Sequence, residues 1–173
     1  MGLASCDLSS VLYNLPVWKT ITVGESIRPD LPHDSPCIGP WCRDVLERVV
    51  PSPSPLQLDL IIASPAHFGF EMGGSYRELH EMSRTFDFEL CPADASLELL
   101  REDYRGQPDG LLHIISESIP DSDGEECIFV ISLEGGKTVL RVTRADPERV
   151  LSASSKMILV RNKRVLNSRS TVH

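Results

Sequence analysis

The fold is decided by the stretch Cys127-Ile-Phe-Val-Ile-Ser-Leu133, Glu134-Gly-Gly-Lys137 and Thr138-Val-Leu-Arg-Val-Thr143. Two runs of strand length flank a tetrapeptide with two adjacent glycines, which supply the positive φ angles that a tight turn requires. The stretch therefore predicts a β-hairpin with strands over 127–133 and 138–143. Such a hairpin favours a sheet that is largely antiparallel.

Further strands and helices are predicted on both sides of this hairpin. Leucines that alternate with polar residues predict a strand over 56–63, and Ser75 and Glu78 have the spacing of a capping box that begins a helix. Asp146 and Pro147 have the N-cap and N1 pattern of another short helix. The remaining expected elements are strands over 86–90, 111–119 and 156–160 and a helix that follows Pro92 and reaches Tyr104. Helices and hairpins segregate along the chain, so the order indicates an α+β fold with a mixed, largely antiparallel sheet and two to three short helices.

Residues 1–55 differ from the rest of the chain because they contain eight of its 13 prolines. Proline fixes φ and removes a backbone donor, so such a segment resists regular helices and sheets. A strand is nevertheless expected over 17–23 and a short helix over 41–50, and Pro51-Ser-Pro-Ser-Pro55 has the composition of an extended spacer. We therefore expect a Pro-rich N-terminal arm over 1–55, a compact α+β domain over 56–162 and a polar tail over 163–173.

The composition excludes several classes of protein. The chain has 173 residues, of which 41% are hydrophobic and 24% charged, values that exclude collagen, a coiled coil and wholesale disorder. A formal net charge of −8 is repelled by phosphate backbones, so nucleic acid is not an expected partner. No apolar run approaches the ~20 residues of a membrane-spanning helix, and the N-terminus lacks the pattern of a secretory signal. We therefore expect a soluble, cytoplasmic protein that does not bind a membrane.

The five cysteines are expected to be free thiols, because an odd number without a secretion signal is typical of a reducing compartment. Cys37 and Cys42 have a zinc-like spacing, and His33 would add a third ligand, but no fourth ligand lies nearby. Asp121-Ser-Asp-Gly-Glu-Glu126 resembles a calcium loop, yet Val130 stands where that loop needs an acidic residue. We expect neither a bound metal nor another cofactor.

Part of the chain resembles a small domain found in bacterial hypothetical proteins. The resemblance is carried by Phe88-Glu-Leu-Cys-Pro92, Leu97 through Tyr104, Gln107-Pro108 and the strand expected over 111–119. It covers roughly residues 56–162. The resemblance implies a bacterial, cytosolic origin and implies nothing about chemistry.

Charge is distributed unevenly along the sequence. Residues 71–126 carry fifteen acidic and four basic side chains, whereas residues 156–173 carry five basic and no acidic ones. A field of this kind steers association with a basic partner. We therefore expect a non-enzymatic interaction protein, of the immunity, inhibitor or adaptor type, that binds a protein partner through an acidic surface. The acidic residues expected at that surface are Asp121, Asp123, Glu125 and Glu126.

The loop expected over 64–74 contains His67, Phe68, Phe70 and Met72. Apolar side chains on a long loop either pack as a satellite of the core or form a binding surface. Packing is the favoured interpretation. A binding surface that includes His67, Phe68 and Phe70 is the alternative.

The alternative function is a small thiol-dependent hydrolase with Cys91 as nucleophile and His80 or His67 as base. Cys91 comes just before Pro92 at an expected helix start, where the helix dipole lowers the pKa of a thiol. No glycine elbow accompanies it. A cavity that joins Cys91 to one of these histidines would favour the enzyme, and a flat acidic patch would favour the interaction protein.

Overall fold

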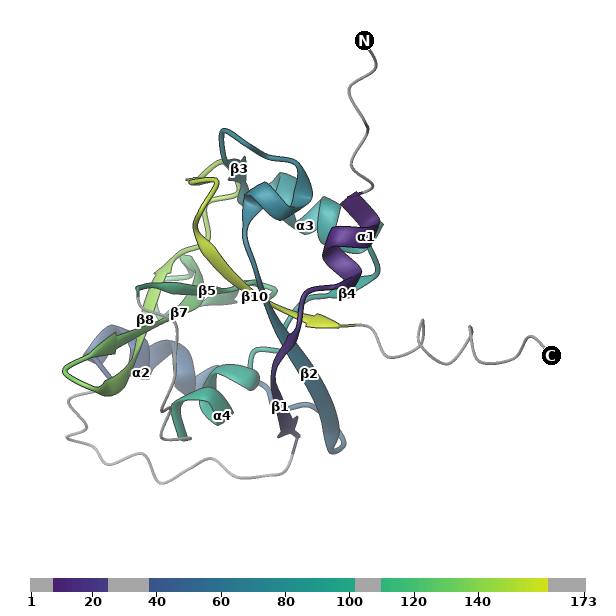
Figure 1. Ribbon diagram of the computed structural model, residues 1–173. Coiled ribbons are helices and arrows are strands. Elements are labelled where there is room, and N and C mark those ends of the chain that lie inside the picture. The colour runs from purple at the N-terminus through teal and green to yellow at the C-terminus, as the bar shows by residue number, and fades with distance from the viewer. Residues whose placement is uncertain (1–7, 25–37, 102–109, 162–173) are drawn as a thin grey trace, which may run out of the picture.

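The computed structural model describes residues 8–24, 38–101 and 110–161 (Figure 1). It confirms the predicted α+β class, with four helices and a mixed, mostly antiparallel sheet of eight strands in these ranges. The helices are α1 (Leu8–Tyr13), α2 (Pro40–Glu47), α3 (Tyr76–Thr85) and α4 (Ala95–Arg101), and a 3-10 helix, η1, spans Pro65–Phe68.

The large sheet has the strand order β1-β2-β10-β5-β7-β6, with β4 also paired to β10 and β8 paired to β7. Its strands are β1 (Val17–Val23), β2 (Leu56–Ala63), β4 (Phe88–Glu89), β5 (Leu112–Ile114), β6 (Ile119–Pro120), β7 (Glu126–Glu134), β8 (Lys137–Arg144) and β10 (Lys156–Arg161). The pairing of β10 with β5 is parallel. A second sheet of two strands joins β3 (Gly74–Ser75) to β9 (Val150–Leu151).

The predicted hairpin is confirmed as β7 and β8. Glu134 lies opposite Lys137, and the two residues between them are Gly135 with φ 58° and Gly136 with φ 78°. A two-residue turn of this kind needs positive φ at both central positions, which glycine adopts without a Cβ clash. The local sequence therefore sets the register of the longest strand pair.

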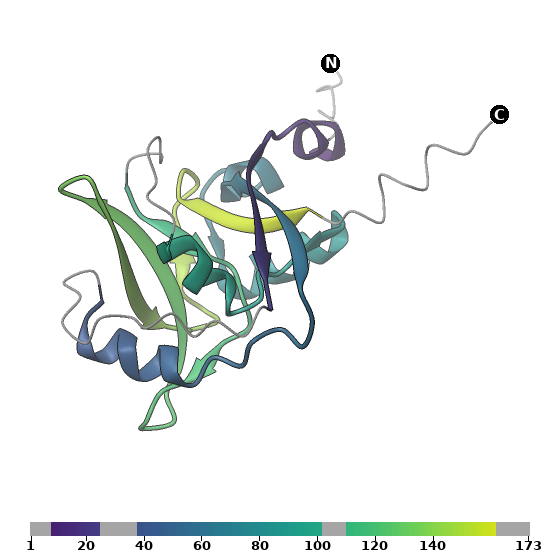
Figure 2. The same cartoon turned by 90° about the horizontal axis from the view of Figure 1, so that it is seen from below.

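Two clusters of buried side chains lie on opposite faces of the large sheet. Successive side chains of a strand point to opposite faces, so Leu60 belongs to the cluster that packs against α2 and α4, and Ile61 to the cluster that packs against α1 and α3. Figure 1 shows α1 and α3 above the sheet and α2 and α4 below it, and Figure 2 shows the lower side. The sheet is therefore covered on both faces.

The capping box predicted for α3 is also confirmed. The Ser75 backbone N–H donates to the Glu78 carboxylate at 2.8 Å, and the Glu78 N–H donates to the Ser75 hydroxyl at 3.3 Å. Tyr76 and Leu79 are buried on one face of α3, and the charged residues of the other face remain exposed. This local sequence positions a polar helix face beside the sheet.

The described parts of residues 1–55 pack into the same core as the rest of the described chain, although their proline content predicts an arm. β1 pairs with β2 from Val17 opposite Ile61 to Val23 opposite Leu56, and α2 buries Val45 against the sheet. β1 contains no proline, and Pro40 occupies the first turn of α2, where a missing N–H costs nothing. The prolines therefore separate the elements without excluding them from the fold. The polar tail over 163–173 lies outside the described residues.

Two other predicted elements differ in the structure. Asp146 and Pro147 begin a turn instead of a helix, and the Asp146 carboxylate accepts the Glu148 N–H at 3.0 Å, because β9 already begins at Val150. The single strand expected over 111–119 is divided into β5 and β6. At Ile115 the chain no longer pairs with β7. The Ile115 N–H donates to the Ile158 carbonyl of β10, and the Ile115 carbonyl accepts the Cys91 N–H.

Candidate functional site

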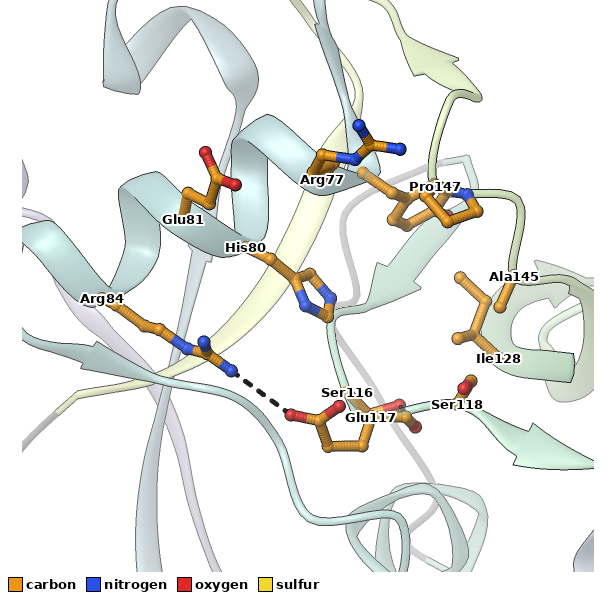
Figure 3. A pocket seen from close by; sticks show the side chains of 11 residues that line it. Arg77, His80, Glu81, Arg84, Ser116, Glu117, Ser118, Ile128, Ala145 and Pro147 are labelled. Atoms are coloured by element: carbon orange, nitrogen blue, oxygen red, sulfur yellow. Dashed lines mark hydrogen bonds and ion pairs between the residues drawn. The ribbon is translucent and has the colours of Figure 1, made fainter.

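A cavity of about 360 Å³ lies between α3, the segment that joins β5 to β6, and the residues that follow β8 (Figure 3). With Ile128 of β7, it brings together four separate parts of the chain. The residues that line it are Tyr76, Arg77, His80, Glu81, Arg84, Ser116, Glu117, Ser118, Ile128, Ala145 and Pro147. His80 is the one of them that the sequence analysis above names as a candidate catalytic residue.

The spacing of α3 explains its contribution to the cavity. Side chains three and four positions apart lie on one face of a helix, so Arg77, His80 and Arg84 form one row. The opposite wall is the backbone turn at 116–118, in which the buried Ser116 hydroxyl donates to the Glu117 carbonyl at 3.0 Å. Ile128, which is buried, contributes an apolar surface. The cavity is therefore polar along α3 and apolar toward β7.

His80 is the central polar group of this cavity. Figure 3 shows its imidazole pointing into the cavity from α3. The backbone carbonyl of His80 accepts the Ser83 hydroxyl at 2.8 Å, whereas the imidazole makes no hydrogen bond to any other residue in the described parts of the chain. Burial lowers the pKa of His80 below its ordinary value of 6.5; the nearby Glu117 opposes this shift and Arg84 adds to it. The imidazole is therefore neutral near pH 7, with one ring nitrogen as donor and the other as acceptor.

The ion pairs at the rim of the cavity are weak. The Arg84 guanidinium lies 3.5 Å from the Glu117 carboxylate, and these side chains are 67% and 76% exposed. Arg77 pairs with Glu148, and both side chains are likewise exposed. Exposed pairs of this kind contribute at most about 1 kcal/mol to stability, so a ligand can replace their partners at small cost.

Asp121, one of the predicted binding residues, is buried beneath the turn that contains it. It is only 8% exposed, and its carboxylate accepts the backbone N–H groups of Asp123 at 3.0 Å and Glu125 at 2.9 Å and the indole N–H of Trp41 at 3.1 Å. The bond from Glu125 is the main cause that holds the pKa of Asp121 below its ordinary value. Asp121 therefore organises the turn through these hydrogen bonds.

The other predicted acidic residues are exposed around that turn. Asp123 and Glu126 point outward, while Glu125 is paired with Arg144 at 2.5 Å. The Ser122 N–H donates to the Asp44 carboxylate at 2.8 Å, so the turn is held against α2. The exposed carboxylates of α2 and of this turn form a surface that is called the acidic surface below. Its carboxylates are those of Glu47, Asp123, Glu125 and Glu126.

Trp41 is the residue of this surface that sequence reasoning missed. Trp41 has the helical spacing of an apolar stripe with Val45 and Val49, but it is 42% exposed. The reason is its position at the start of α2, where the indole N–H reaches Asp121, and a tryptophan N–H that leaves water needs such a partner. The signal available in the sequence was the Pro-Trp pair at a helix start.

Cys91 and the histidines proposed as its base lie in separate places. Cys91 is 2% exposed, its thiol donates to the Ile158 carbonyl at 3.5 Å, and burial raises its pKa to about 12. It does not line the cavity that contains His80, and His67 instead accepts the Ser64 N–H through Nδ1 at 2.9 Å. Cys91 forms an isolated bridge with Ser116, and α4 begins only at Ala95, so Cys91 does not stand at the start of that helix.

The aromatic loop over 64–74 packs on the core, as the favoured interpretation predicted. Phe68 is 2% exposed, and its ring centroid lies 6.0 Å from that of Phe86 and 6.1 Å from that of Phe88. Phe70 is half-buried against the same cluster. Of the three residues of the alternative binding surface, Phe68 and Phe70 pack inward and His67 caps η1.

No family model, no curated protein and no solved structure matches the chain. Among the described residues, no three His, Cys, Asp or Glu side chains gather so that they could hold a metal ion, and His33 and Cys37 lie outside those residues. No helix in the described ranges is long and apolar enough to cross a membrane. Two arrangements therefore remain for a function, the acidic surface around Trp41 and the cavity around His80.

Proposed function

We propose that this protein is a non-enzymatic interaction protein that binds a basic protein partner through the acidic surface, with Trp41 as its anchor. The observation that carries the proposal is the hydrogen bond from the Trp41 indole to the Asp121 carboxylate at 3.1 Å. It holds a large aromatic side chain partly exposed beside several carboxylates. Exposed tryptophans that become buried on binding are among the side chains that contribute most to protein interfaces.

The charges around Trp41 favour a basic partner. Glu47, Asp123 and Glu126 are exposed, and none of them forms an ion pair with another described residue. The pair of Glu125 with Arg144 is itself exposed, so it contributes little and can be exchanged. Uncompensated carboxylates on one surface increase the rate at which a basic protein meets it.

The turn is also fixed before a partner arrives. The Asp121 N–H donates to the Glu125 carbonyl at 3.0 Å, and the Gly124 N–H donates to the Asp121 carbonyl at 3.1 Å. The bond between Ser122 and Asp44 ties the turn to α2. A surface that is already ordered loses less conformational entropy on binding, which increases affinity without any added contact.

The position of Cys91 supports a role without thiol catalysis. A thiol nucleophile must be accessible and partly ionised, whereas Cys91 is buried and its pKa is raised to about 12. The alternative hydrolase therefore lacks an activated thiol beside either histidine.

The proposal is tested by affinity capture from lysate of the native host, followed by kinetic measurement with the captured partner. The double variant Asp123→Lys/Glu126→Lys should slow association at least 10-fold. The association rate of the natural chain should also fall steeply as salt shortens the Debye length from about 10 Å at 0.1 M to about 3 Å at 1 M.

Trp41→Ala should raise Kd by about 30-fold, as expected for an interface hot spot. The matched control Glu71→Lys/Glu89→Lys changes the same charge at exposed positions elsewhere and should leave both constants unchanged. Equal effects of the two double variants would contradict the proposal.

A further inference from the structure

The cavity around His80 carries charges of both signs and uses none of the residues of the acidic surface. Arg77 and Arg84 line it together with Glu81 and Glu117. The two positive and two negative charges of these four side chains cancel, and His80 adds no charge because it is neutral near pH 7. The cavity therefore favours neither an anion nor a cation. It offers charged donors and acceptors to a ligand that carries a positive and a negative charge together.

Arg84 and Glu117 present their opposite charges next to each other at one end of the cavity. Figure 3 shows the guanidinium reaching from α3 toward the carboxylate on the opposite wall, and the two groups approach to 3.5 Å. A ligand with a carboxylate and an ammonium group would give each of them a new charged partner. No charge would then be left unpaired, and charge-assisted hydrogen bonds of this kind are about twice as strong as neutral ones.

The His80 imidazole lies beside this pair without a hydrogen-bond partner among the described residues. A half-buried ring nitrogen that lacks a partner loses the hydrogen bond that water would provide. Its N–H can donate to the same ligand carboxylate that Arg84 would contact. The imidazole and the Arg84 guanidinium would thus bind the carboxylate of a ligand together.

The far side of the cavity is apolar, because Ile128, Ala145 and Pro147 line it. Figure 3 shows these three side chains on the side opposite Arg84. The volume of about 360 Å³ is at the lower end of the 300–1,000 Å³ range of ligand pockets. A small molecule with one apolar side chain fits both the size and the polarity.

We propose that this cavity binds a small zwitterion of the amino-acid class, with its carboxylate at Arg84 and His80, its ammonium group at Glu117 and an apolar side chain against Ile128 and Pro147. Apolar L-amino acids are the chemical class that combines these groups. The site goes beyond the proposed partner binding, and the two can succeed or fail independently because they share no residue.

The test titrates the full chain with alanine, valine, leucine and phenylalanine, and follows the ring C–H signals of His80 by NMR, assigned through His80→Gln. At least one of these amino acids should bind saturably and shift the His80 signals. Its C-terminal amide and its N-acetyl derivative, each of which lacks one charge, should bind at least 10-fold more weakly. Absence of saturable binding by all four amino acids would overturn the proposal, as would equal binding of the blocked derivatives.

Single variants assign the two charges of the ligand. Arg84→Gln should abolish the preference for the free carboxylate over the amide, and Glu117→Gln should abolish the preference for the free amine over the N-acetyl form. Both side chains are largely exposed, so the variants should keep the melting temperature of the natural chain. The matched control is Arg101→Gln, whose guanidinium pairs with Glu98 on α4 at the other face of the sheet and which should bind normally. Unchanged preferences in Arg84→Gln and Glu117→Gln would overturn the assignment.

Discussion

Asp94 and Ser52 are joined by two hydrogen bonds: the Ser52 backbone N–H donates to Oδ2 of Asp94 at 2.8 Å and the Ser52 hydroxyl donates to Oδ1 at 3.2 Å. Asp94 is buried just before α4, whereas Ser52 belongs to the Pro-Ser run between α2 and β2. A single carboxylate therefore anchors the proline-rich connection to the domain. The residues on either side of this run are part of one core.

Asp94→Ala should lower the free energy of unfolding by about 2 kcal/mol, because hydrogen bonds to a charged group contribute about 1.5–3 kcal/mol and the Ser52 N–H loses its acceptor. Urea denaturation followed by circular dichroism measures this change. Glu89→Ala removes an exposed carboxylate from β4 and should change stability by less than about 0.5 kcal/mol. An Asp94→Ala variant as stable as the Glu89→Ala control would show that the anchor is dispensable.

Deletion of residues 1–50 should abolish cooperative unfolding. The deletion removes β1 and α2, and with them the buried side chains of Ile21, Val45 and Leu46, and it leaves β2 with an unpaired edge. Unpaired edges of this kind promote aggregation. Thermal denaturation and size-exclusion chromatography of the truncated chain provide the measurement. A folded, monomeric remainder with a sharp transition would restore the arm that proline density predicted.

Stability should decrease as the pH falls from 6.5 to 4, because His113 is buried as a neutral group. Its Nδ1 lies 2.9 Å from the Tyr76 hydroxyl, and burial, helped by Arg149, lowers the pKa of His113 to about 4. Between that value and the ordinary pKa of 6.5 the unfolded chain binds a proton that the folded chain does not. The stabilisation is therefore fully present above pH 6.5 and is lost toward pH 4, with a total on the order of 3 kcal/mol.

Urea denaturation at pH 7, 6, 5 and 4 measures this dependence. His113→Gln should flatten the slope between pH 6.5 and 4, whatever its effect on stability at pH 7. The other four histidines of the chain stay in place, and His80, whose pKa burial also lowers, keeps its own contribution to the slope. A variant with the slope of the natural chain would assign the pH dependence to other groups.

The buried thiols should react slowly in the folded protein. Burial raises the pKa of Cys42 and Cys91 to about 12 and that of Cys127 to about 11, so the reactive thiolate is scarce at pH 8. In a Cys6→Ser/Cys37→Ser background, reaction with an aromatic disulfide reagent should be at least 100-fold slower in buffer than in 8 M urea. Rapid modification of Cys91 in the folded protein would instead favour the thiol hydrolase.

Features that depend on neighbouring residues could be predicted from the sequence. The glycine pair at 135–136 imposes a turn with positive φ, the leucine alternation at 56–63 imposes a strand, and Ser75 with Glu78 begins α3. Each of these depends on side chains no more than a few positions apart. Local propensity therefore predicted the α+β class and most element positions.

Contacts between side chains that are distant in sequence could not be predicted in this way, because they depend on the packing of the whole chain. Trp41 and Asp121 are 80 residues apart in the sequence, and the cavity joins α3 to segments near residues 117 and 146. The same packing buried Cys91 and Phe68, two residues whose local patterns were compatible with function. Burial and contact depend on how the sheet brings distant segments together, and the sequence carries that information only through the energy of the whole fold.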